Sequence, residues 1–246
     1  MVTVQVHDRS FSNIEAIVFD KDGTLANTEA YLIQLGQKRS RLIDAQVPGV
    51  SEPLQMAFGL ERNRLNPEGM MAIASRKECE IATAGFVAET GKPWIEALNL
   101  SKSVFAEAAD YLSPKCEYTP LLPGVFELIC DLAQHPIQLA ILSSDTTENV
   151  EAFIQHHQLS TYIHLGQGVE GLLTKPDPAL LLNLCQDLGV LPQNTLMVGD
   201  SAADIQMAIA AQAAGSIGVT WGWQTPIRLP EADVEAATPE QIKIIR

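Results

Sequence analysis

Two aspartates, Asp20 and Asp22, close an apolar run near the start of the chain and flank a lysine, in the stretch IEAIVFDKDGT of residues 14–24. Successive residues of an extended chain point to opposite faces, so side chains two positions apart point the same way. Asp22 can therefore rise above Asp20 where the chain turns at Gly23. Two carboxylates at this spacing can take different roles, because one can stay ionised while the other exchanges a proton.

Further polar groups occur later in the chain, each after a predicted strand or before a predicted helix. They are Ser143-Ser144-Asp145, the loop Lys175-Pro176-Asp177-Pro178, and the stretch from Asp200 to Asp204. Carboxylates from two strand ends can share one Mg²⁺, which prefers oxygen ligands. A lysine and a hydroxyl can neutralise and orient the oxygens of a phosphoryl group. Taken together, these groups supply the parts of a phosphoryl-transfer site.

Each of these signals has a structural alternative. Asp20 and Asp22 could be turn residues, and the later serines and aspartates could serve only as helix caps. Lys175 could be a solvated loop lysine. An EF-hand loop is excluded, because it requires Gly at its sixth position and Glu at its twelfth, where this chain has Leu25 and Tyr31.

Two other features are expected to be structural rather than functional. The segment 166–171 fits G-x-G-x-x-G, but it leads into Leu-Leu-Thr-Lys-Pro and cannot open a helix as a dinucleotide site requires. We interpret it as a turn-rich loop. Trp221 and Trp223 are expected to pack near an edge of the sheet rather than to bind substrate.

The elements that hold these residues follow a recurring pattern. Short apolar runs that end in polar loops occur at residues 14–20, 137–143, 195–200 and 215–219. Such runs are typical of strands buried on both faces of a parallel sheet. Helical patterns follow at residues 146–157, 178–188 and 201–213. This alternation predicts an α/β fold with a doubly wound parallel sheet, which binds ligands beyond the carboxyl ends of its strands.

A long insertion separates the first apolar run from the second. Its stretches 28–46, 66–90 and 93–111 carry helical periodicity, with Pro and Gly breaks between them. We therefore predict two domains: an α/β core formed by residues 1–26 and 119–246, and an all-helical insertion of residues 27–118.

The composition is that of an ordinary globular protein, since 46% of the 246 residues are hydrophobic and 19% are charged. A formal net charge of −14, with only 16 Lys and Arg, argues against nucleic-acid or anionic-membrane partners. Dispersed cysteines without a CxxC pattern argue against a zinc site or a disulfide framework. Without a signal or spanning segment, we predict a cytoplasmic protein, either a monomer or a homodimer.

In order and spacing these motifs resemble those of the haloacid dehalogenase (HAD) superfamily. The resemblance rests on DKDGT, the strand-end serine, the Lys-Pro pair and GDSAAD, and it covers the chain from about residue 14. It is most similar to the phosphatases and mutases with a helical cap after the first strand, the phosphoglycolate phosphatase and β-phosphoglucomutase group. The resemblance implies a HAD Rossmann-like core with an all-helical cap.

The resemblance also implies a role for each motif residue. Asp20 would be the nucleophile that forms an aspartyl-phosphate, and Asp22 would be the general acid and base. The metal would be held by Asp20, Asp200 and the backbone carbonyl of Asp22. The phosphoryl group would be bound by Ser143, Ser144 and Lys175. Asp204 would support the metal site or ligate directly, and Thr24 would stabilise the loop. Lys21 and Ser144 depart from the subgroup, which commonly has an apolar residue and Asn there.

These roles imply a Mg²⁺-dependent phosphatase that hydrolyses a small phosphomonoester, so its partner would be a small phosphorylated metabolite. Dehalogenases of the superfamily lack the second aspartate, so Asp22 favours phosphoryl transfer. A phosphosugar mutase of the β-phosphoglucomutase type would use the same residues and remains an alternative. So does a non-catalytic phosphate-binding protein, although the intact motif residues argue against it. Specificity is predicted to lie in the segment GLERNRLN, with Arg62 and Asn63 as the residues to test.

Overall fold

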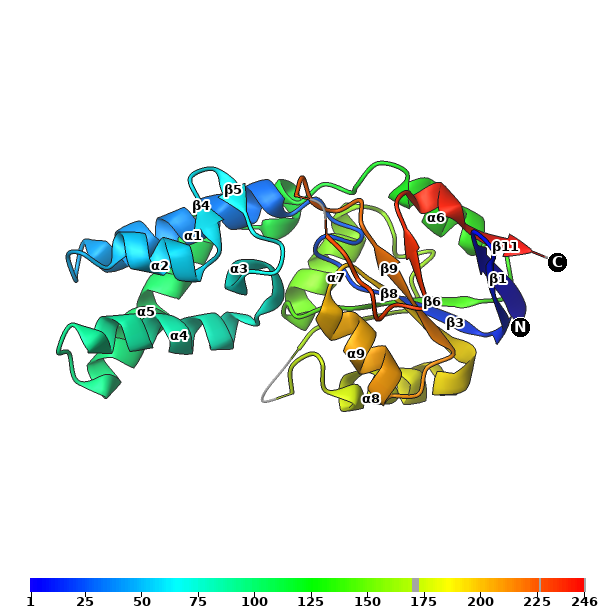
Figure 1. Ribbon diagram of the computed structural model, residues 1–246. Helices are drawn as coiled ribbons and strands as arrows, with labels where there is room; N and C mark the ends of the chain where they lie inside the picture. The colour runs from blue at the N-terminus through cyan, green and yellow to red at the C-terminus, as the bar shows by residue number, and fades with distance from the viewer. Residues whose placement is uncertain (170–172, 226, 246) are drawn as a thin grey trace. The chain divides into compact units, whose positions relative to one another are not determined.

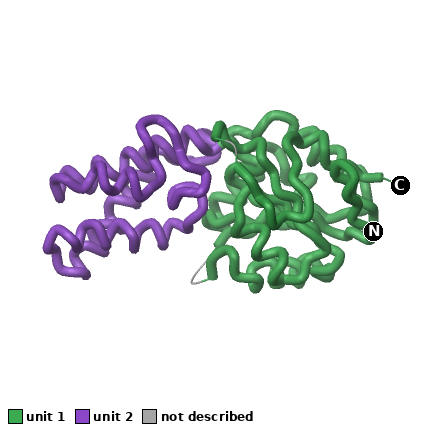
Figure 2. The backbone as a smooth tube through the Cα atoms, viewed as in Figure 1, with its two compact units in different colours: residues 1–27, 120–246 green, residues 28–119 purple. Residues whose placement is uncertain are grey.

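The chain divides into two compact units (Figure 2), one formed by residues 1–27 and 120–246 and the other by residues 28–119. The computed structural model describes residues 1–169, 173–225 and 227–245 (Figure 1). The division made from the sequence has similar bounds. That the second unit acts as a cap on the first stays a prediction.

A six-stranded parallel sheet, in the order β10-β9-β8-β3-β6-β7, forms the centre of the first unit (Figure 1). Its strands are β3 (Ala16–Phe19), β6 (Gln138–Leu142), β7 (Leu165–Gln167), β8 (Thr195–Gly199), β9 (Gly215–Val219) and β10 (Val234–Ala236). The flanking helices are α6 (Val125–Leu132), α7 (Thr147–His156), α8 (Pro178–Leu188) and α9 (Ala202–Ala210), with the short 3₁₀ helices η2 (Pro192–Asn194) and η3 (Pro239–Gln241). This confirms the predicted doubly wound α/β fold. Because β3 lies between β6 and β8, the loops after these three strands meet at one edge.

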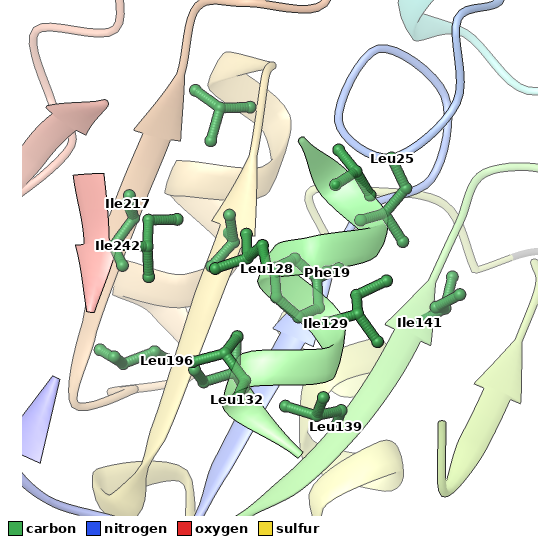
Figure 3. Packing of buried hydrophobic residues seen from close by; sticks show 14 of the residues in the cluster. Phe19, Leu25, Leu128, Ile129, Leu132, Leu139, Ile141, Leu196, Ile217 and Ile242 are labelled. Carbon is green, nitrogen blue, oxygen red and sulfur yellow. The ribbon is translucent and has the colours of Figure 1, made fainter. Parts of the chain in front are cut away.

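Burial on both faces explains why these strands are apolar without interruption. Ile17 and Phe19 join the cluster formed with α6 and α7 on one face of the sheet. Figure 3 shows Phe19 in this cluster with Leu128 and Ile129 of α6. Ala16 and Val18 join a second cluster, with side chains of α8 and α9. A slip of one residue would exchange the two sets of side chains, so packing on both faces fixes the register.

A small antiparallel sheet, in the order β11-β1-β2, adds to the first unit and was not predicted. Its strands are β1 (Val2–Val6), β2 (Arg9–Ile14) and β11 (Ile242–Ile245). Val4, Val6, Phe11 and Ile242 bury their side chains in the same cluster as Phe19. The two ends of the chain thus complete the core of the first unit.

The second unit is mainly helical. Its elements are α1 (Glu29–Asp44), α2 (Ser51–Ala57), β4 (Leu60–Glu61), β5 (Arg64–Leu65), α3 (Met70–Ile73), α4 (Arg76–Glu89), α5 (Trp94–Asp110) and the 3₁₀ helix η1 (Lys115–Tyr118). The predicted helical stretch 66–90 is divided into α3 and α4, and α4 begins at Arg76 because Ser75 caps it in a capping box with Glu78. The hairpin β4–β5 is an addition to the predicted helices. None of the described helices combines the length and apolar character needed to cross a membrane.

The G-x-G-x-x-G segment lies partly outside the described residues, since 170 and 171 belong to the undescribed stretch. Its first two residues belong to β7, at an edge of the sheet. A Cβ at Gly168 would collide with the backbone of Thr146 and Thr147, so this glycine lets two loops approach closely. Close packing of the two loops accounts for Gly168.

Candidate active site

Three aspartates converge where β3 and β8 end. Asp20, Asp200 and Asp204 are buried, and each offers a carboxylate oxygen within 4.8 Å of the others. Asp20 and Asp200 directly follow their strands, whereas Asp204 lies in the first turn of α9. There it forms a capping box with Ser201, whose hydroxyl donates to Asp204 Oδ2 at 2.6 Å. The sequence-based expectation that these motifs meet at one sheet edge is confirmed in geometry.

Lys175 reaches this cluster from the loop before α8. Its ammonium donates to Asp20 Oδ1 at 2.6 Å, to Asp204 Oδ1 at 2.8 Å and to the carbonyl of Leu142 at 2.7 Å. An ammonium has three N–H donors, so these acceptors satisfy it fully. The side chain is only 3% exposed, and the alternative of a solvated loop lysine is therefore wrong.

The electrostatics of this cluster favour a cation. Burial raises the pKa of Asp20 to about 6, because lost hydration outweighs the attraction of Lys175, and Asp204 adds repulsion. The pKa of Asp200 also lies well above its ordinary value, first through burial and then through repulsion from Asp20 and Asp204. Burial opposes the charge of Lys175, but Asp20 and Asp204 outweigh it and raise the pKa of the ammonium. The carboxylates are thus incompletely neutralised, a condition that a divalent cation relieves.

Asp200 is held from two loops. Thr24 Oγ1 donates to its Oδ1 at 3.0 Å, and the indole Nε1 of Trp223 donates to its Oδ2 at 2.5 Å. Trp221 Nε1 donates to the carbonyl of Thr24 at 2.9 Å. Gly23 has φ 86°, and a Cβ there would collide with Asp200 and lie 2.6 Å from the Trp223 ring. The two tryptophans were expected to pack near a sheet edge, and the hydrogen bond from Trp223 to Asp200 was not predicted. Their position just after the predicted strand 215–219 was the only signal for it in the sequence.

Asp22 pairs with Lys21, whose ammonium contacts its Oδ1. The same ammonium lies 3.1 Å from Asp145 Oδ2, on the loop after β6. The backbone N–H of Asp145 donates to Ser143 Oγ at 3.2 Å, and the Ser143 side chain is buried. Ser144 follows on this loop and is half-buried. The predicted phosphate-binding loop therefore lies beside the predicted acid, while a metal contact from the Asp22 carbonyl stays a prediction.

Arg62 and Asn63 belong to the second unit, where they form the turn between β4 and β5. Arg62 has φ 57°, and both side chains are exposed. The Gln37 side chain donates to the Arg62 carbonyl at 3.3 Å and to Asn63 Oδ1 at 3.4 Å. The turn is thus tied to α1, and its role in specificity stays a prediction.

The model of the haloacid dehalogenase-like hydrolase family matches residues 14–212, which include the whole aspartate cluster and Lys175. The chain is a haloacid dehalogenase-like hydrolase. This match leaves outside only the ends of the chain, which hold most of the β11-β1-β2 sheet and the two tryptophans near the site.

Several relatives of this haloacid dehalogenase-like hydrolase carry the name phosphoglycolate phosphatase. The present chain is 32% identical over 127 residues to a phosphoglycolate phosphatase from Pseudomonas putida. This alignment covers 50% of the present chain and 46% of that protein. The chain is 28% identical over 213 residues to one from Synechococcus elongatus, covering 85% of each. The chain spans about half the length of the Pseudomonas putida relatives it matches.

Solved structures show the same fold. A predicted phosphoglycolate phosphatase from Haemophilus somnus superposes with a TM-score of 0.66 and 23% identity, covering 91% of this chain and 94% of that one. At this identity the likeness concerns the fold alone. It agrees with the six-stranded sheet and its flanking helices.

Proposed function

We propose that the chain is a Mg²⁺-dependent phosphatase that hydrolyses a small phosphomonoester through a phosphoryl group carried on Asp20. The observation that carries this proposal is the convergence of Asp20, Asp200 and Asp204, two of which, Asp20 and Asp204, accept from the Lys175 ammonium. The names of the relatives make phosphoglycolate the first small phosphorylated metabolite to test. A cytoplasmic location and a monomeric or homodimeric state are predicted with it.

The donor set fits Mg²⁺. It consists of buried carboxylate oxygens, which this hard cation prefers, and their raised pKa values mark negative charge that protein groups leave uncompensated. Asp20, Asp200 and the backbone carbonyl of Asp22 would hold the ion. Asp204, which accepts from Lys175 at Oδ1 and from Ser201 at Oδ2, would support the site by holding Lys175 beside Asp20. When bound, the ion would neutralise the carboxylates and polarise the phosphoryl oxygens.

The proposed reaction has two displacements at phosphorus. In the first, an oxygen of Asp20 forms a bond to phosphorus, the ester P–O bond breaks, and the leaving oxygen takes a proton from Asp22. In the second, water attacks phosphorus and gives a proton to Asp22, and the P–O bond to Asp20 breaks. Inorganic phosphate leaves and both carboxyl groups regain their starting states.

Lys175 would offset the charge of the phosphoryl group during these steps, and Ser143 would bind it. The Lys175 ammonium is already fixed 2.6 Å from Asp20 Oδ1. It therefore lies beside the carboxylate of Asp20, which would form the new bond to phosphorus. A fixed charge at this place can offset charge on the non-bridging oxygens without reorganising. The Ser143 hydroxyl, at the end of the neighbouring strand β6, can donate to one of those oxygens.

The test compares Asp20→Asn with Asp22→Asn by mass spectrometry after brief exposure to an aryl phosphate. Asp20→Asn should never gain a phosphoryl group. Asp22→Asn should be phosphorylated, because an activated ester needs little protonation, and should then hydrolyse about 10²–10⁴-fold more slowly than the wild type. Asp187→Asn, an exposed aspartate on α8, is the matched control and should behave as the wild type.

The outcomes separate the competing functions. If neither active-site variant is ever phosphorylated, or if Asp20→Asn keeps substantial turnover, the covalent mechanism is wrong. Transfer of the phosphoryl group to a second sugar hydroxyl in place of water would identify a mutase. Phosphate binding by the wild-type protein without turnover of any ester would identify a non-catalytic binding protein.

A further inference from the structure

Lys21 lies between the two proposed catalytic aspartates in sequence, yet its side chain points away from solvent and is only 1% exposed. Its ammonium contacts Asp22 Oδ1 and lies 3.1 Å from Asp145 Oδ2. The centre of the Phe153 ring is 5.7 Å from the same nitrogen. A buried ammonium with two carboxylate partners and an aromatic neighbour is held in place, because it has no water into which to move.

Asp145 is itself fixed at the start of α7. Its Oδ1 accepts from the backbone N–H of Thr146 at 2.9 Å and from Asn149 Nδ2 at 2.8 Å. This leaves Oδ2 to face Lys21. A continuous set of polar contacts therefore runs from the first turn of α7 through Asp145 and Lys21 to Asp22.

The same aspartate also orients the phosphate-binding loop. The backbone N–H of Asp145 donates to Ser143 Oγ, so Ser143 and Lys21 both take their positions from Asp145. Asp22 and Ser143 lie on the loops that follow two different strands, β3 and β6. The ammonium of Lys21 contacts Asp22 and Asp145 together, and so links the Asp22 side chain to the loop that holds Ser143.

We propose that Lys21 is a positioning residue that fixes the carboxylate of Asp22 relative to the phosphate-binding loop, so that the acid faces the leaving oxygen. The inference rests on the proposed function, in which Asp22 gives and takes the proton. The Lys21 ammonium is engaged by the carboxylates of Asp22 and Asp145, so its effect on the reaction passes through Asp22. Steps that need proton transfer should therefore depend on Lys21, whereas attack by Asp20 on an activated ester should not.

The experiment compares two esters in the full-length Lys21→Met variant, which keeps the length of the side chain and removes its charge. Turnover of an alkyl phosphomonoester should fall about 10–100-fold, the usual effect of removing a group that orients a reacting side chain. The single-turnover rate at which nitrophenyl phosphate phosphorylates Asp20 should stay within about threefold, since its leaving group needs little protonation. Hydrolysis of the phosphoryl-enzyme should be slowed together with alkyl turnover.

Three further variants complete the design. Lys243→Met removes an exposed lysine of β11 and should change neither the turnover of the alkyl ester nor the rate of phosphorylation by nitrophenyl phosphate. Lys21→Arg restores the charge and should recover part of the alkyl turnover, which a purely structural role would not require. Asp145→Asn should reproduce the selective loss in weaker form, and combining it with Lys21→Met should add little, because both changes break one chain of contacts.

Equal losses for both esters in Lys21→Met, or undiminished turnover of the alkyl ester, would overturn the positioning role. If Lys21→Met does not fold, Asp145→Asn decides the question by the same comparison of esters. If the wild-type enzyme never carries a phosphoryl group on Asp20, the proposed function fails and this inference fails with it. Failure of the selectivity in an enzyme that is phosphorylated normally concerns Lys21 alone.

Discussion

In the metal-free protein, replacing Asp20 by Asn is expected to stabilise the fold at neutral pH, although it removes the proposed nucleophile. The raised pKa of Asp20 shows that burial, with repulsion from Asp204, outweighs the attraction of Lys175 for the ionised carboxylate. Asn has nearly the same size and cannot ionise. It therefore stands in for the protonated carboxyl group at every pH.

The size of the effect follows from the pKa of Asp20. A rise from 3.8 to about 6 costs the ionised form roughly 3 kcal/mol, since each tenfold change in proton affinity is worth about 1.4 kcal/mol. Between these two values the folded protein binds more protons than the unfolded chain, so the wild-type stability falls as pH rises. The advantage of Asp20→Asn should grow from near zero below about pH 4 to about 3 kcal/mol above about pH 6.

Urea unfolding of both proteins in excess chelator, at several pH values from about 4 to about 7.5, measures this difference. Comparing the two proteins at each pH cancels the titration of distant groups. The exposed control Asp187→Asn should differ little from the wild type throughout, because its side chain keeps its hydration on folding. Mg²⁺ at neutral pH should reverse the order, since an ion that binds only the folded wild-type site stabilises it by mass action.

A difference that stays constant across this pH window would refute the electrostatic reasoning. So would a difference that moves in favour of the wild type as pH rises. Either result would mean that Lys175 holds the pKa of Asp20 at or below its ordinary value, and that burial is the smaller effect.

Three further substitutions test the rest of the site. Asp200→Ala should abolish Mg²⁺-dependent turnover and leave the protein folded, and undiminished turnover in excess chelator would contradict the metal assignment. Trp223→Phe removes the donor to Asp200 Oδ2 but keeps a ring in place, so the Mg²⁺ Kd measured by calorimetry should weaken about 10–100-fold with little change in unfolding. Replacing Arg62 and Asn63 by Ala should change the ranking of substrates more than the turnover of nitrophenyl phosphate. Equal losses for every substrate would remove the β4–β5 turn from the specificity role.

The strands that position the site could be predicted because they are buried on both faces. β3, β6, β8 and β9 have continuous apolar runs, whereas the edge strands β7 and β10 are short and only partly buried. β1 alternates Val2, Val4 and Val6, a pattern that favours a half-buried strand. Its partner β11 lies at the other end of the chain, and local patterns carry no information about that pairing.

The site itself was predictable in part for the same reason. Asp20, Asp200 and Ser143 follow central strands directly, so the topology alone brings them to one edge. Lys175 comes from a loop, and its position depends on three acceptors that only the folded chain assembles. The contacts of Lys21 with Asp22 and Asp145 depend on rotamers inside a buried space, which sequence spacing does not specify.

Trp223 shows most clearly what spacing leaves out. Gly222 packs so closely on Gly23 that a Cβ at Gly222 would collide with the Gly23 carbonyl. Two glycines, far apart in sequence, thus let the loop after β9 settle on the loop after β3. Thr24 on one loop and Trp223 on the other then donate to the two oxygens of Asp200. The orientation of the proposed metal ligand is therefore set by a backbone contact, and the absence of side chains at two positions makes that contact possible.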